Sequence, residues 1–323
     1  QRQMCIRDSY YLDDNVAFEA FKAGSYDLRS EDSPKNWATR YIGTNFARGY
    51  IVKDEQTNHS AQDARWLAFN IQRPVFADRR VREAVSLAFD FEWMNKALFY
   101  GAYSRADSYF INTEYAARNY PDADELTLLA PLKDQIPPEV FTQIYSPPTS
   151  SGDGYDRQNL LKADKLLNDA GWVLKNQQRV NAKTGKPFVF ELLLPSGGNV
   201  QWVLPFQHNL ARLGITMELR QVDNSQATNR MRSRDYDMMP RLWRAQPWPS
   251  GDLQISWGSA YIDSSYNAPG VKNPAIDTLL EQIARWQGNK EKLLPLGRAL
   301  DRVLTWNYYM LPMWYMAADR LAY

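Results

Sequence analysis

A strand, a helix and a second strand follow one another between residues 188 and 222, and this order constrains the fold more than any other feature. Phe188 to Leu194 is an apolar run of strand length, and Ile215 to Val222 alternates apolar and polar residues. Between them an apolar helical stripe is formed by Val203, Phe206, Leu210 and Leu213. Such a crossover requires parallel strands joined by a right-handed connection, so we expect an α/β fold.

Strand and helix patterns alternate along most of the remaining chain. Further strands are predicted at 66–71, 236–243 and 310–317. Helices are predicted at 13–24, 78–99, 156–170 and 225–234, followed by two with the stripes Ile276, Leu279, Leu280, Ile283 and Leu293, Leu296, Leu300, Val303. In the first helix we expect Val16, Ala20 and Phe21 to share a face. Residues 103–154 show only weak periodicity, and a loop that long is usually functional or wraps another lobe.

Composition excludes several classes of protein. Lys and Arg number 38 and Asp and Glu 37, so the nearly neutral chain gives no reason to expect nucleic acid or an anionic membrane as a partner. No run of 18 apolar residues occurs, which excludes a transmembrane helix. With one cysteine, Cys5, no intrachain disulfide can form. With His59 and His208 as the two histidines, a zinc site would need mostly carboxylates, so no metal is expected.

Motifs of enzyme active sites are missing as well. Gly185-Lys186 is followed by Pro187, which rules out a phosphate-binding loop, and neither G-x-S-x-G nor H-E-x-x-H occurs. Asp235 and Asp237 are a carboxylate pair, but alternation along a strand accounts for their spacing. We therefore predict no catalytic residues and no cofactor.

The segment after the predicted strand 236–243 is rich in tryptophan. Open α/β sheets bind ligands just past the carboxyl ends of their strands. At this place the sequence has aromatic residues interleaved with polar ones: Arg241, Trp243, Arg244, Gln246, Trp248, Asp252 and Trp257. Such a set fits a groove with apolar walls and a few polar anchors. The alternative is that these tryptophans pack beneath a long loop. Stacked single-stranded nucleic acid is a third interpretation, which the neutral charge disfavours.

Short motifs in a fixed order point to a family. They are Phe69-Asn70, Pro74-Val75-Phe76-Ala77-Asp78, Val81-Arg82-Glu83-Ala84, Phe99-Tyr100-Gly101, Ala170-Gly171-Trp172, Leu213-Gly214-Ile215, Asp235-Tyr236-Asp237 and Asn273-Pro274-Ala275-Ile276-Asp277. In order and spacing this chain resembles the family-five extracellular solute-binding proteins, from about Asp13 to Tyr323. Within that family, residues 87–116 and 257–264 are most similar to periplasmic oligopeptide-binding components of ABC importers.

The resemblance implies a two-lobed, type II periplasmic binding protein of the large class with an extra domain (cluster C). Family members are longer than this chain, so we expect it to be an internal part of such a protein, mostly lobe two. The expected division is 1–9 foreign or disordered, 10–65 a lobe-one remnant with the hinge approach, 66–308 lobe two, and 309–323 a strand returning towards lobe one.

The resemblance also implies a non-enzymatic periplasmic receptor. It would act as a monomer, enclose short peptides between two lobes and deliver them to the permease subunits of an ABC importer. The residues predicted to bind the peptide are Trp243, Arg244, Gln246, Trp248 and Trp257, with Asn70, Tyr109 and Asp252 in addition. The same fold with an opine, a sugar or a peptide-like antibiotic as cargo is the first alternative, and a hydrolase is the second.

One position departs from the family pattern. In peptide-binding relatives the strand before the equivalent of Trp243 pairs with the peptide backbone, and an Asp three residues after that Trp holds the peptide's amino group. Here that position is Gln246, which forms hydrogen bonds but carries no charge. Either Asp252 takes over the role, or the amino group of the ligand is blocked or placed elsewhere.

Overall fold

The computed structural model describes residues 9–197 and 200–323, and the chain divides into two compact units. The first comprises the described residues up to His59, with Phe99–Ala102 and Ala317–Tyr323. The second comprises Ser60–Leu98 and Tyr103–Met316. Apart from Ser9, the segment predicted to be foreign or disordered lies outside the described residues. The assignment of the units to two lobes stays a prediction.

The first unit is a small α/β layer with its own core. Its three strands lie in the order β1-β11-β2 and pair antiparallel: β1 (Arg29–Ser30), β11 (Ala318–Ala322) and β2 (Lys53–Thr57). Its helices are α1 (Asp14–Lys22), α2 (Pro34–Thr39) and α3 (Thr44–Ala47). The predicted helical face of α1 was wrong in one respect, because Val16 is 57% exposed. The buried pair is Phe18 and Phe21, which pack against Trp37 and Tyr41.

The second unit is built on a six-stranded sheet in the order β4-β10-β3-β9-β7-β8. The strands are β3 (Ala64–Phe69), β4 (Ser104–Arg105), β7 (Val189–Pro195), β8 (Thr216–Val222), β9 (Met238–Trp243) and β10 (Met310–Tyr315). The predicted crossover through α9 (Val203–Arg212) is confirmed, because β7 and β8 pair in parallel along their whole length. The pairs β4–β10, β10–β3 and β3–β9 are antiparallel, so the sheet is mixed.

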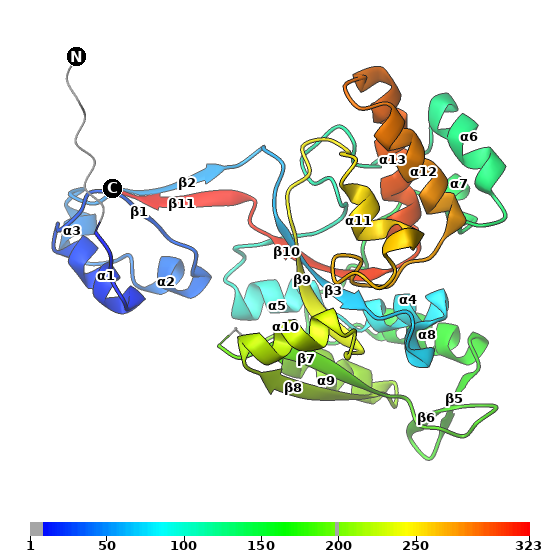
Figure 1. The fold of residues 1–323 in the computed structure, drawn as a ribbon. Helices are drawn as coiled ribbons and strands as arrows, with labels where there is room; N and C mark the ends of the chain where they lie inside the picture. Colours follow the sequence, from blue (N-terminus) through cyan, green and yellow to red (C-terminus); the bar gives the residue numbers. More distant parts are fainter. Residues whose placement is uncertain (1–8, 198–199) are drawn as a thin grey trace. The chain divides into compact units, whose positions relative to one another are not determined.

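Helices pack on both faces of this sheet (Figure 1). Trp66 and Ala68 of β3 belong to the core under the group α6 (Ala123–Leu129), α7 (Glu139–Thr142), α11 (Leu253–Trp257), α12 (Pro274–Arg285) and α13 (Lys290–Trp306). Phe69 is an odd-numbered residue of the same strand, so it lies on the other face of the sheet. It contacts Phe76, and Phe76 contacts Phe190 of β7. The further helices are α4 (Arg79–Leu87), α5 (Phe91–Leu98), α8 (Arg157–Asp169) and α10 (Asn224–Arg232), with 3-10 turns η1 (Pro74–Phe76), η2 (Ala130–Leu132) and η3 (Ser259–Tyr261).

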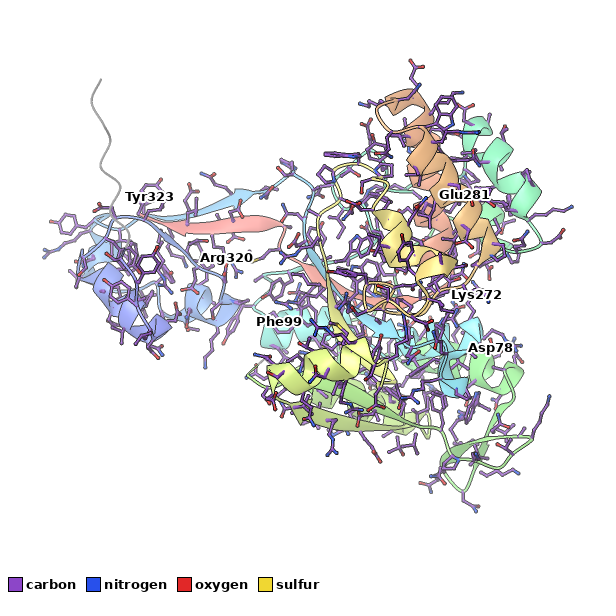
Figure 2. All side chains as sticks on the ribbon, viewed as in Figure 1. Asp78, Phe99, Lys272, Glu281, Arg320 and Tyr323 are labelled. Carbon is purple, nitrogen blue, oxygen red and sulfur yellow. The ribbon has the colours of Figure 1, made fainter. Side chains whose placement is uncertain are left out.

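The single helix predicted over 78–99 was wrong, because two helices occupy this range. Asp78, labelled in Figure 2, precedes α4. Its carboxylate caps the helix by accepting the backbone N–H of Arg80 at 2.8 Å. The chain then turns at Ala88–Asp90, and the Asp90 carboxylate accepts the N–H of Trp93 at 3.0 Å, which starts α5. An Asp inside a periodic pattern competes for backbone donors and begins a new helix.

A short hairpin was not predicted. It consists of β5 (Trp172–Lys175) and β6 (Gln178–Asn181). Both residues of its turn have positive φ, 49° for Asn176 and 65° for Gln177, as a type I′ turn requires. None of the helices in the described part of the chain is long and apolar enough to span a membrane.

Candidate functional site

The strand β9 has one edge that no described strand occupies beyond its first residue. On one side β9 pairs with β3 from Met238 to Trp243. On the other side it meets β7 at one pair only, Leu192 with Met238. The residues Pro240 to Trp243 therefore have a free edge.

The backbone groups on this edge follow from the register. The N–H of Asn70 donates to the carbonyl of Asp237 at 2.9 Å, which makes this pair a hydrogen-bonded one. In an antiparallel ladder such pairs alternate, so the N–H and C=O of Leu242 and the C=O of Pro240 point away from β3. Proline has no N–H, which leaves Leu242 as the donor and both residues as acceptors.

A cavity of about 260 Å³ lies along this end of β9. It is lined by Arg241, Leu242, Trp243, Arg244, Gln246, Ser256, Trp257, Tyr266, Ala268, Pro269 and Met310. Four of the residues predicted from the sequence are among them: Trp243, Arg244, Gln246 and Trp257. A pocket bounded by two indole rings, a strand edge and two guanidinium groups suits a ligand with both apolar and polar parts.

Trp243 lies between the cavity and the core. Its side chain is partly buried, and its Nε1–H donates to the carbonyl of Tyr109 at 2.8 Å. Its ring centroid lies 5.3 Å from that of Trp257 and 5.4 Å from that of Tyr109. Trp243 therefore lines the cavity and also packs against core residues, and its role in ligand binding stays a prediction.

Tyr109 packs against Trp243 on the side of the core. It is 1% exposed and stacks on Trp66 at a centroid distance of 4.4 Å. It lies outside the cavity lining, so its predicted role in binding stays a prediction, and its observed contacts position Trp243.

A buried carboxylate holds the segment that carries Tyr109. Asp301 of α13 accepts the backbone N–H groups of Tyr109 at 2.8 Å and Ala117 at 2.9 Å, and the hydroxyl of Ser108 at 2.8 Å. Burial raises the pKa of Asp301 to about 6, although these three donors oppose the shift. The weakly periodic stretch 103–154 is thus fixed to α13 near the site.

Arg244 and Gln246 follow the strand. Nη1 of Arg244 donates to the Asp63 carboxylate at 2.8 Å, and the other oxygen of Asp63 accepts the N–H of Ala245 at 2.7 Å. Gln246 donates to the carbonyl of Arg244 at 3.2 Å. The charge of Arg244 is therefore already matched by Asp63.

The other three predicted residues lie outside the cavity lining. Asn70 is 2% exposed and donates to the carbonyls of Tyr236 at 2.8 Å and Arg234 at 3.2 Å. Trp248 is 53% exposed, and Asp252 is exposed at the start of α11. Their roles in binding stay predictions.

Arg241 belongs to the tryptophan-rich segment noted in the sequence but was not among the residues predicted to bind the peptide, and Tyr266 and Met310 were not predicted at all. Arg241 could have been found, because it lies two residues before Trp243 on a strand and so shares its face. Tyr266 and Met310 come from segments brought in by the fold, and no local pattern marks them.

The described residues offer no group of three or more His, Cys, Asp or Glu side chains arranged to hold a metal ion. Asp235 and Asp237, the carboxylate pair noted above, both contact Arg73, at 3.1 and 3.2 Å. Neither belongs to the cavity lining.

Comparison with known proteins identifies close relatives. The family profile described as "Bacterial extracellular solute-binding proteins, family 5 Middle" matches residues 6–264. The chain is 78% identical over 318 residues to "Uncharacterized protein YejA" of Escherichia coli K12, covering 98% of this chain and 53% of that protein. It is 38% identical to "Probable peptide-binding protein YejA" of Agrobacterium fabrum, covering 98% and 52%. The chain thus spans about half the length of the curated relatives it matches.

Solved structures share the fold. The oligopeptide-binding protein AppA of Bacillus subtilis, in complex with a nonapeptide, matches with a TM-score of 0.68 at 18% identity, over 96% of this chain and 54% of that one. NikA of Brucella suis, in complex with Fe(III)-EDTA, matches with a TM-score of 0.67 at 20% identity, over 96% and 55%. The predicted type II periplasmic binding protein fold is confirmed.

Proposed function

Because the chain belongs to the bacterial extracellular solute-binding proteins of family 5, we propose that it is the ligand-binding part of a periplasmic receptor for short peptides. The receptor passes its peptide to the permease subunits of an ABC importer and works as a monomer. The observation that carries the proposal is the free edge of β9 beside the cavity, at Pro240–Trp243.

A strand edge suits a peptide whatever its sequence. Leu242 offers one donor and one acceptor, and Pro240 offers a second acceptor, to an extended backbone lying alongside. Main-chain hydrogen bonds of this kind give affinity, while the pockets for alternate side chains set preference. The indole rings of Trp243 and Trp257 supply an apolar wall at a low entropy cost. The name of the relative in Agrobacterium fabrum, a probable peptide-binding protein, agrees with this ligand.

The geometry favours a receptor over a hydrolase. The carboxylate with the most perturbed environment near the site is Asp301, and it faces the backbone donors of Tyr109 and Ala117. A general acid or base has to reach the bond that it cleaves. Asp63 is paired with Arg244, which lines the cavity.

The direct test is to identify the ligand. The full-length protein that carries this chain would be purified from the periplasm without denaturation, and the bound compounds released and analysed by mass spectrometry. Calorimetry with a mixed library of short peptides would then measure binding. Intact peptides in the released material, together with saturable binding of the library, are expected. Cleaved library peptides would point to the hydrolase instead.

A non-peptide cargo is the competing proposal, and NikA with its Fe(III)-EDTA is a solved case of this fold with such a ligand. Recovery of a metal chelate, an opine or a sugar, with no heat of binding for any library peptide, would overturn the peptide proposal and leave the receptor class in place.

A further inference from the structure

Arg241 is a cation in the cavity wall that the chain itself does not neutralise. Within the described residues its one hydrogen-bond partner is the thioether of Met231, 2.8 Å from Nη1. A thioether is a weak acceptor and carries no charge. No described carboxylate lies within ion-pair distance of this guanidinium, and its remaining donors, Nε and Nη2, are not sealed away from solvent.

Several other arginines of the second unit have polar or charged partners. Arg302 pairs with Glu125 at 2.8 Å. Arg82 donates to backbone carbonyls at Phe76, Ala77, Asn307 and Tyr308. Arg244, the second guanidinium of the cavity, is held by Asp63 at 2.8 Å. Among the described residues Arg105 has no hydrogen-bond partner, but its guanidinium is buried against the rings of Phe89 and Phe91. Arg241 differs from it because it lines the cavity, where a ligand is expected.

The surroundings of Arg241 are mostly uncharged. It projects from the same face of the sheet as Trp66, its partner across the β3–β9 ladder. Its nearby polar neighbours include two phenols, Tyr236, which is buried and donates to the carbonyl of Ala268, and Tyr266, which is exposed at the cavity. Burial lowers the pKa of Arg241, because the guanidinium is partly removed from water and no described carboxylate offsets that cost.

We propose that Arg241 is the anion anchor of this site and that the preferred ligands present a carboxylate to it. The inference rests on the proposed receptor function and adds a chemical class to it. A planar guanidinium with free Nε and Nη2 donors can bind a carboxylate through two parallel hydrogen bonds, and the apolar wall formed by Trp243 and Trp257 would strengthen that bond. A ligand without the negative charge would leave the guanidinium desolvated and unpaired, so the site discriminates against it.

In a peptide the carboxylate has two sources, the carboxyl terminus and an acidic side chain. The test therefore uses two matched pairs of short-peptide libraries with the full-length protein: free acid against C-terminal amide, and Glu against Gln at a fixed position of the amidated peptides. Calorimetry should show the charged member of at least one pair binding about tenfold or more tightly than its neutral counterpart. The pair that shows the preference names the source.

Variants then assign the preference to one residue. Arg241→Gln should reduce it to within about twofold, and Arg241→Lys should retain part of it, since a lysine keeps the charge but loses the planar fork. Arg65→Gln is the matched control, because Arg65 is exposed on the neighbouring strand and lies outside the cavity lining. It should leave the preference intact.

The outcomes separate the two proposals. If the wild-type protein binds charged and neutral libraries equally well, or if Arg241→Gln keeps the full preference, the anion anchor is wrong and the peptide receptor stands. If the wild-type protein binds no library at all, the peptide receptor itself is wrong. Should Arg241→Gln fail to fold, as a melting curve would reveal, Arg241→Lys takes its place, and a full preference in that variant would overturn the anchor.

Discussion

At the scale of single residues, Trp243 joins the cavity to the core beneath it. We expect Trp243→Ala in the full-length protein to weaken peptide binding by ~2 kcal/mol or more, roughly thirty-fold, because a large anchoring surface is lost. The free energy of unfolding should fall by only about 1–2 kcal/mol, since the ring is partly buried and makes one hydrogen bond, to Tyr109. Calorimetry and urea unfolding measure the two effects on one variant.

Trp257→Ala is the natural comparison for that experiment. Trp257 is 1% exposed, so its removal should cost the ~3–5 kcal/mol of unfolding free energy typical of a buried large-to-small change. Wild-type affinity in a destabilised Trp243→Ala protein would contradict the binding role of Trp243.

Asp301 should make the free energy of unfolding depend on pH. Burial raises its pKa from 3.8 to about 6 in the folded state. The folded protein therefore holds this proton more tightly than the unfolded chain. The resulting stabilisation is complete below pH 4 and is lost as the pH rises through 6, at up to about 1.4 kcal/mol per pH unit. Asp301→Asn removes this titration.

Urea unfolding of wild type and Asp301→Asn at pH 4, 5, 6 and 7 checks the sign. The free energy of unfolding of the wild type minus that of the variant should decrease from pH 4 to pH 7, because contributions of other groups cancel in the difference. A difference that stays constant, or one that increases towards pH 7, would show that the three hydrogen bonds outweigh burial and keep Asp301 ionised.

Single-residue roles were the hardest to read from the sequence. Trp243 could be placed because it ends a predicted strand. Tyr109 and Asn70 could not, since what decides their exposure is distant in sequence: Trp66 stacks on Tyr109, and the carbonyl of Tyr236 accepts from Asn70. Contacts between residues that are distant in the sequence produce no local sequence pattern from which they could be predicted.

At the scale of elements, the free edge of β9 leads to a prediction about peptide affinity. Leu242→Pro deletes the one N–H that Pro240–Leu242 offers to a peptide, while the pairing with β3 survives, because Leu242 and Arg65 form a non-hydrogen-bonded pair. Losing one hydrogen bond of about 1 kcal/mol should weaken peptide binding by roughly five- to tenfold.

Leu242→Ala is the control for that experiment, since it removes the side chain and keeps the N–H. It should cost less peptide affinity than Leu242→Pro, because the side chain of Leu242 lines the cavity but is 41% exposed. Equal losses in both variants, measured by calorimetry beside a melting curve, would mean that the side chain and not the strand edge contacts the ligand.

Elements with an uninterrupted hydrophobic period could be predicted from the sequence. Elements that begin or end inside such a period were harder to predict. The βαβ unit followed from its apolar runs because Phe190, Leu192, Leu193 and Leu194 of β7 are buried and α9 has one buried face. The range 78–99 has the helical period throughout, and the break at Ala88–Asp90 depends on hydrogen bonds that the period does not encode. The β5–β6 hairpin depends on two non-glycine residues with positive φ, which sequence seldom reveals.

At the scale of the whole molecule, the chain contains two units with cores of very different size. The core of the first unit is a small cluster around Phe18, Phe21, Trp37 and Tyr41. That of the second extends through α6, α11, α12 and α13 to β3 and β10. These cores show why each unit is compact, and the assignment of the units to two lobes stays a prediction.

The difference in core size predicts how the chain opens. A small core supports a low free energy of local unfolding, so backbone amides of the first unit should exchange with solvent at least about tenfold faster than those of the second. Hydrogen exchange of the 323-residue chain, followed by mass spectrometry, measures this directly. Peptides covering α1 and β2 report on the first unit, and peptides covering α13 and β10 report on the second.

Because β2 is mostly exposed and β10 is buried, the decisive comparison is between the buried turns of α1 and α13, where solvent access is matched. Exchange of both helices at one common rate would mean that the chain unfolds as a single cooperative body, and the two-unit description would then hold for contacts but not for stability.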